Sequence, residues 1–194
     1  SAYAISAGIS GILAAGFADK FDRKKLLLFF YTGFIIGTAF CALAYNYHTL
    51  LLARIVTGLF GGVVGSISMA IITDVFSLNQ RGRVMGFVQM AFAGSQILGI
   101  PIGLLLANMW GWHATFIMVV ILSVLIGVAV VMRLKPLTEH LKLQSDKNAL
   151  QHLWHTIQKR DYRIGFMATA MLSLGGFMLM PFTSAFLVNN VLIA

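Results

Sequence analysis

Six charged side chains stand together in the stretch FADKFDRKKLL, between two long apolar runs. They are Asp19, Lys20, Asp22, Arg23, Lys24 and Lys25. Acids and bases this close together can form ion pairs that hold two elements in one arrangement, or they can make a solvated connection between apolar segments. Which role applies depends on where the stretch lies relative to the elements around it.

Arg54 is the other charge that could act chemically, because it lies about one turn inside an apolar run. A charge there is costly and is a functional hypothesis by default. The alternative is that Arg54 extends to the lipid headgroups. The helical face that carries it also carries Gly58, Gly61, Gly62 and Gly65. Glycines on one face indicate close helix contact, so we expect Arg54 to point into protein or a cavity.

The apolar run at residues 84–109 contains polar and helix-bending residues. Pro101 lacks an N–H, and Gly99 and Gly103 would let a neighbour approach closely. We therefore expect a bend at a helix interface. Gln89 and Gln96 share a face of the same helix, where they either tie helices together or line a water-filled pathway.

The motifs H-E-x-x-H, G-x-S-x-G and C-x-x-C, which organise common enzyme and metal sites, do not occur. His140, His152 and His155 have no acid or cysteine partners at metal-ligand spacing. The six acids fall at the ends of the apolar runs or between them, so no pair of carboxylates lies inside one. We predict no enzyme, no cofactor and no metal ion.

The composition is that of a membrane protein. Of 194 residues, 59% are hydrophobic and 10% are charged, and the mean hydropathy is +0.87. An average soluble domain is about 25% charged. Six apolar runs are about long enough for an α-helix to cross a bilayer, at residues 1–18, 26–44, 50–73, 84–109, 114–132 and 164–186. We predict an all-α, polytopic transmembrane helix bundle.

The positions of the bases predict its orientation. Thirteen of the fourteen lysines and arginines fall in alternate connections, which the positive-inside tendency assigns to the cytoplasm. Tyr45, Tyr47, Trp110 and Trp112 stand in the other two connections and suit the opposite interface. The net charge of +8 therefore reflects orientation in a lipid bilayer, and we expect no nucleic-acid partner.

One connection, at residues 136–163, is much longer than the others. Within it, Leu150, Leu153, Trp154 and Ile157 follow helical spacing beside several bases. Such a helix can lie on an anionic leaflet or pack on the protein's own cytoplasmic face. We predict a bundle at 1–135, this connection at 136–163, and the first helix of a second bundle at 164–194. Because both ends of the chain are apolar, we expect a piece of a longer protein.

The charged stretch resembles a loop motif of the major facilitator superfamily. That motif reads G-x-x-x-D-[RK]-x-[GP]-x-[RK]-[RK], and residues 15–25 read AGFADKFDRKK, with Asp22 at the Gly/Pro position. Two further motifs follow in the family's order. Arg54 and Gly58 match R-x-x-x-G, and the segment with Gly99, Pro101 and Gly103 resembles the bend motif of the drug:proton antiporter and arabinose-efflux-permease-like branches.

The resemblance implies that the six runs are the family's second to seventh helices, without the first. It also implies a charge cluster that gates the pathway. Asp19 would cap a helix of the opposite bundle, where an acid at a helix N-terminus is favourable. Lys20, Lys24 and the pair Arg23 and Asp74 would complete the cluster, and Arg54 would influence proton coupling or substrate.

The function implied is proton-coupled efflux of small drug-like or sugar-like molecules by alternating access. A facilitator or symporter of the same fold, or a non-transporting membrane scaffold, is the alternative. The expected partners are a small-molecule substrate, protons and the lipid bilayer, with a monomer as the full-length state. The expected location is the plasma membrane, in bacteria the inner membrane.

Overall fold

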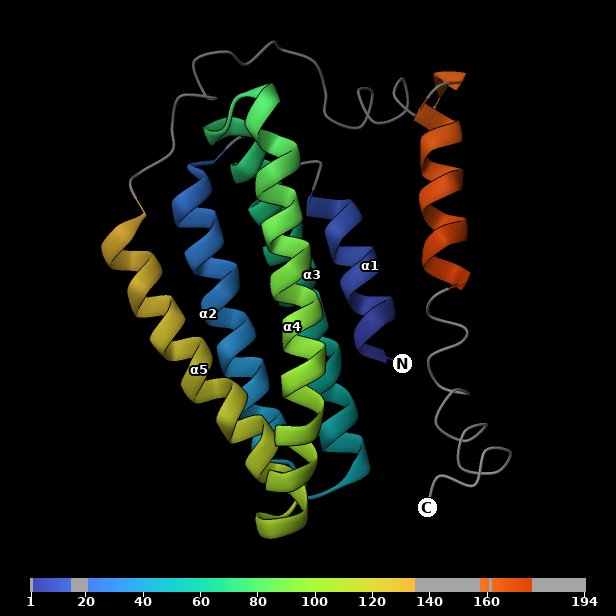
Figure 1. Cartoon of the computed structure of the whole chain (residues 1–194). Helices are drawn as coiled ribbons and strands as arrows, with labels where there is room; N and C mark the ends of the chain where they lie inside the picture. The colour runs from blue at the N-terminus through green and yellow to red at the C-terminus, as the bar shows by residue number, and fades with distance from the viewer. Residues whose placement is uncertain (1, 15–20, 135–157, 161, 176–194) are drawn as a thin grey trace. The chain divides into compact units, whose positions relative to one another are not determined.

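The computed structural model in Figure 1 describes residues 2–14, 21–134, 158–160 and 162–175. Every regular element in these ranges is helical. The helices are α1 (Ala2–Ala14), α2 (Arg23–Ala42), α3 (Tyr47–Val75), α4 (Leu78–Trp110) and α5 (Trp112–Arg133). The chain divides into two compact units, Ser1–Ser145 and Asp146–Ala194. Of the second unit, the described part is helical at residues 162–175.

The helices confirm the all-α fold that the sequence predicts. α2, α3, α4 and α5 are each long and apolar enough to cross a membrane, and α1 is a shorter apolar helix. Their starts differ from the apolar runs, since α4 begins at Leu78 rather than near Val84. Arg81 and Arg83 therefore belong to the first turns of this helix and not to a connection. Most of the predicted connection at 136–163 lies outside the described residues.

Within the first unit, α2 lies between α3 and α5, while α1 packs on α3 and α4 packs mainly on α5 (Figure 1). The buried core combines branched apolar side chains, among them Val63 and Ile67, with small ones, including Ala14, Cys41 and Thr57. Large apolar side chains cover the outside instead, as expected for helices that face lipid. Small residues let the helix backbones approach one another closely.

The contact between α1 and α3 depends on glycine. A Cβ at Gly58 would collide with the Ser6 hydroxyl and the Tyr3 carbonyl, and one at Gly62 would collide with the Ala7 carbonyl. Side chains at these two positions would push the helices apart. The glycine face predicted from the sequence is thus a helix contact, although Gly65, at its far end, faces open space.

A single residue, Gly111, connects α4 to α5. It ends the first helix, with its N–H donating to the Ala107 carbonyl at 3.0 Å, and it begins the second. Its backbone has φ 84° and ψ 163°, a region that is essentially restricted to glycine. The turn allows α5 to fold back on α4, where the Thr115 hydroxyl donates to the Gly103 carbonyl at 3.0 Å.

Candidate functional site

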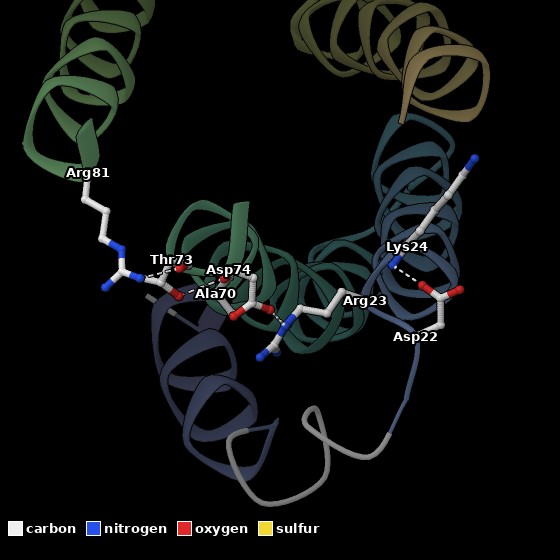
Figure 2. Close-up of polar contacts among 7 residues, drawn as sticks. All are labelled: Asp22, Arg23, Lys24, Ala70, Thr73, Asp74 and Arg81. Carbon is white, nitrogen blue, oxygen red and sulfur yellow. Dashed lines mark hydrogen bonds and ion pairs between the residues drawn. The ribbon is translucent and has the colours of Figure 1, made fainter. Parts of the chain in front are cut away.

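An ion pair joins the beginning of α2 to the end of α3. The Arg23 Nε donates to Asp74 Oδ2 at 2.5 Å, and the two side chains point toward one another in Figure 2. The Arg23 side chain is 8% exposed and that of Asp74 is 28% exposed. We call the region formed by the starts of α2 and α4 and the ends of α3 and α5 the charged end of the bundle.

Both partners of this pair oppose the dipole of their own helix. Arg23 is the first residue of α2, where the helix dipole disfavours a positive charge. Asp74 is the second-last residue of α3, where the dipole disfavours a negative charge. Each charge is therefore badly placed in its own helix, and the other partner compensates for it. Separation of α2 from α3 at this end would leave both charges at unfavourable helix ends.

Two neighbours of Arg23 shape the start of α2. Asp22 is the N-cap, and its carboxylate accepts a hydrogen bond of 2.9 Å from the Lys24 backbone N–H. The Lys24 ammonium donates to the Val131 carbonyl at 3.1 Å, in the last turn of α5. Asp22 thus replaces the Gly or Pro of the family motif by a capping residue. Lys24 links α2 to α5 rather than joining Arg23 and Asp74.

Arg81, in the first turn of α4, contacts the end of α3 at the charged end of the bundle. Its guanidinium donates to the carbonyl oxygen of Thr73 at 2.6 Å (Figure 2). It also donates to the carbonyl oxygen of Phe76 at 3.0 Å. The last carbonyls of a helix have no partner within it, and a cation there also compensates the negative end of the dipole. Arg81 therefore caps the C-terminal end of α3, while Arg23 pairs with the carboxylate of Asp74 near the same end.

The structure thus brings together two members of the predicted charge cluster, Arg23 and Asp74. Lys24 lies beside them but contacts α5. Asp19 and Lys20 lie outside the described residues, so their part in the cluster stays a prediction.

Arg54 lies about 10 Å along α3 from its first residue, Tyr47, at 1.5 Å per residue. Its guanidinium carbon lies 5.2 Å from the centre of the Tyr3 ring and 5.6 Å from that of Phe116. These rings belong to α1 and α5, so three helices meet at this cation. The side chain is exposed in the chain as described, and both ring contacts are at cation–π distance.

The remaining predicted residues lie on α3 and α4. Gly58 is at the contact with α1, as described above. Gly103 is buried against Thr115, whereas Gly99 faces open space and Pro101 lies inside the continuous helix α4. The predicted bend at Pro101 stays a prediction.

The amides of the two predicted glutamines differ in exposure. Gln89 is exposed and Gln96 is half-buried. Their proposed contact with a water-filled pathway stays a prediction. Across the described ranges, no group of three His, Cys, Asp or Glu side chains could hold a metal ion.

The sequence did not predict several contacts that hold the helices together. His113 Nε2 lies 3.2 Å from the Ala44 carbonyl and ties the start of α5 to the end of α2. The Tyr31 hydroxyl donates to the Ser123 carbonyl at 2.9 Å, farther along the same two helices. A capping signal, an acid directly before an apolar helix, could have identified Asp22. The other contacts join positions 69 and 92 residues apart, which no local pattern relates.

A family model matches nearly the whole chain, and individual relatives match about two thirds of it. A family model described as the Major Facilitator Superfamily matches residues 1–192. The chain is 31% identical over 118 residues to multidrug resistance protein fnx1 of Schizosaccharomyces pombe, an alignment that covers 61% of this chain and 22% of the relative. It is 30% identical over 129 residues to multidrug resistance protein 3 of Bacillus subtilis, covering 66% of this chain and 25% of the relative.

A third relative is named a probable sugar efflux transporter, from Helicobacter pylori. It is 29% identical over 116 residues, which are 60% of this chain and 30% of the relative. The chain thus spans less than a third of the length of these relatives. The helices of membrane-spanning length, the motifs in the family's order and a family match from end to end agree: the chain belongs to the Major Facilitator Superfamily of multi-pass membrane transporters.

Proposed function

We propose that the protein exports small molecules by alternating access, in exchange for protons. The observation that carries this proposal is the ion pair between Arg23 and Asp74. Alternating access requires contacts at one end of a bundle that hold a closed arrangement and can be released. An ion pair whose partners both oppose their helix dipoles meets this requirement, because either charge loses stabilisation when the pair opens.

The arrangement of the charged end supports a gating role. The contacts of Arg23, Lys24 and Arg81 link the ends of four helices, so movement of one end must disturb the others. We propose that Asp19 and Lys20 extend this cluster to the opposite bundle. The division into a bundle at 1–135, a connection at 136–163 and the start of a second bundle at 164–194 is part of the same proposal.

The substrate class is proposed from the names of the relatives. The names of two relatives concern multidrug resistance, and the name of a third concerns sugar efflux. We therefore propose drug-like or sugar-like cargo. From the resemblance of the sequence motifs to the antiporter branch, we also propose antiport with protons and a monomer in the plasma membrane, which in a bacterium is the inner membrane. The cations at the start of α2 and at the end of α5 would lie at the cytoplasmic surface.

The test is transport by the whole native protein in proteoliposomes. Ethidium and radiolabelled arabinose serve as probes, with and without a pH gradient. We expect a pH gradient to drive the transport of at least one probe. Asp19→Asn should abolish that transport without changing reconstitution.

Asp22→Asn is the matched control, because asparagine also caps helices and the variant removes an acid from the same segment. It should transport as the wild type does. Unchanged transport by Asp19→Asn would refute the gating role. A rate of transport that is the same with and without the pH gradient would refute proton coupling.

A further inference from the structure

Arg54 carries a positive charge that no acid of the described residues balances. The described acids are Asp22 and Asp74, both at the charged end. Asp74 lies twenty residues from Arg54 on the same helix, which at 1.5 Å per residue is about 30 Å. A guanidinium is always charged, and charges inside the bilayer normally pair with a partner or line a pathway.

The surroundings of Arg54 satisfy its charge only in part. The rings of Tyr3 and Phe116 interact with the guanidinium through their faces. Within the described ranges, the guanidinium makes no hydrogen bond or ion pair. Its N–H groups, which form a planar fork suited to a carboxylate, are thus left for a ligand. The side chain is exposed in the part of the chain that the structure describes.

From this geometry we propose that Arg54, Tyr3 and Phe116 form a binding subsite for organic anions, in which a carboxylate pairs with Arg54 and an aromatic or apolar body lies against the two rings. The proposal deepens the transport function above and rests on it. It adds amphipathic acids to the drug-like cargo proposed above. The binding energy comes from two sources, a charge-assisted fork of hydrogen bonds and contact with the aromatic rings.

The three residues come from three helices, so the subsite depends on the packing of the bundle. The glycine contact at Gly58 holds α1 against α3 one turn from Arg54, and therefore sets the position of the Tyr3 ring. Phe116 is supplied by α5, one turn after the Gly111 connection. Arg83 offers a matched comparison, because its guanidinium lies 5.9 Å from the Phe87 ring on a single helix.

The test is binding to the purified native protein in nanodiscs, measured by the fluorescence anisotropy of two xanthene dyes. Fluorescein is an anion and rhodamine 6G is a cation of related shape. We expect fluorescein to bind, benzoate to compete, and benzamide, its neutral isostere, to compete at least tenfold more weakly. Arg54→Gln should weaken fluorescein binding at least tenfold, because it removes both the charge and the fork.

Arg54→Lys should bind with intermediate affinity, since lysine keeps the charge but lacks the planar fork. Phe116→Leu keeps an apolar side chain and should weaken fluorescein binding severalfold. This variant tests the subsite even if Arg54→Gln does not fold. Arg83→Gln should leave the binding of both dyes unchanged. Size-exclusion profiles identify variants that misfold.

Equal competition by benzoate and benzamide would overturn the inference, and so would unchanged fluorescein binding in Arg54→Gln. If Arg54→Gln alters only the dependence of transport on the pH gradient, Arg54 serves coupling and the inference is wrong. These results leave the proposed transport in place. Absence of transport of ethidium, arabinose and fluorescein, with Arg54-dependent binding of fluorescein intact, would instead refute transport.

Discussion

The pair between Arg23 and Asp74 allows a double-mutant cycle with a charge swap. The variants are Arg23→Gln, Asp74→Asn, the two together, and the exchange of Arg23→Asp with Asp74→Arg. Two unit charges about 4 Å apart attract by about 4 kcal/mol at an effective dielectric constant of about 20. Desolvation of both groups and the partial exposure of Asp74 reduce this value. We expect a coupling free energy of about 2 kcal/mol.

The charge swap tests the helix-dipole argument separately. It places an acid at the start of α2 and a base at the end of α3, where each dipole favours the charge, at about 0.3–1 kcal/mol per end. The swapped protein should therefore be at least as stable as the wild type and clearly more stable than either single variant. Its transport should be impaired if release of the pair is part of the cycle.

The assay is equilibrium unfolding in mixed micelles of detergent and SDS, followed by circular dichroism. Lys25→Gln is the control, since this exposed base neighbours Arg23 and should change stability by less than about 0.5 kcal/mol. Additive effects of Arg23→Gln and Asp74→Asn would show that the pair contributes nothing. A swapped protein that is less stable than both single variants would refute the reasoning from dipoles.

Three further substitutions test the packing and the caps, each measured in the same unfolding assay. Gly58→Ala should destabilise by about 1–3 kcal/mol because its methyl group meets the backbone of α1, whereas Gly65→Ala, which faces open space on the same helix, should not destabilise. Gly111→Ala should cost about 1–3 kcal/mol through backbone strain alone, since no atom lies within 4 Å of the added carbon. Arg81→Gln should cost about 1 kcal/mol by removing the hydrogen bond to the Thr73 carbonyl, and a neutral result would contradict the capping role.

The sequence predicts the features of this fold that depend on local pattern. Run lengths identify the helices, and the spacing of Gly58 and Gly62 identifies the face that packs on another helix, because a helix repeats every 3.6 residues. The apolar run begins six residues after the start of α4, because Arg81 and Arg83 in the first turns of the helix interrupt the apolar pattern. Ser77 stands directly before the helix, and serine is a residue type preferred at that position, although its side chain makes no capping hydrogen bond here.

What the sequence does not reveal is which helix ends meet. The contact of Lys24 with Val131 joins positions 107 residues apart, and that of Arg23 with Asp74 joins positions 51 apart. Such contacts follow from the arrangement of the bundle, and no periodicity of a single helix encodes them. The resemblance to a family supplied the pair of Arg23 and Asp74, but not the partner of Lys24.

Both candidate sites share one helix, and this suggests how they could communicate. α3 carries Arg54 near its first turns and Asp74 in its last turn, and it is unbroken between them. A helix transmits a tilt or shift at one end to the other, since its backbone hydrogen bonds keep it nearly rigid. An anion that draws Arg54 toward α5 would therefore move Asp74 relative to Arg23. Each charge of the ion pair is unfavourable at its own helix end, so even a small displacement that breaks the pair would cost free energy. The contacts at both sites would therefore determine the position of α3.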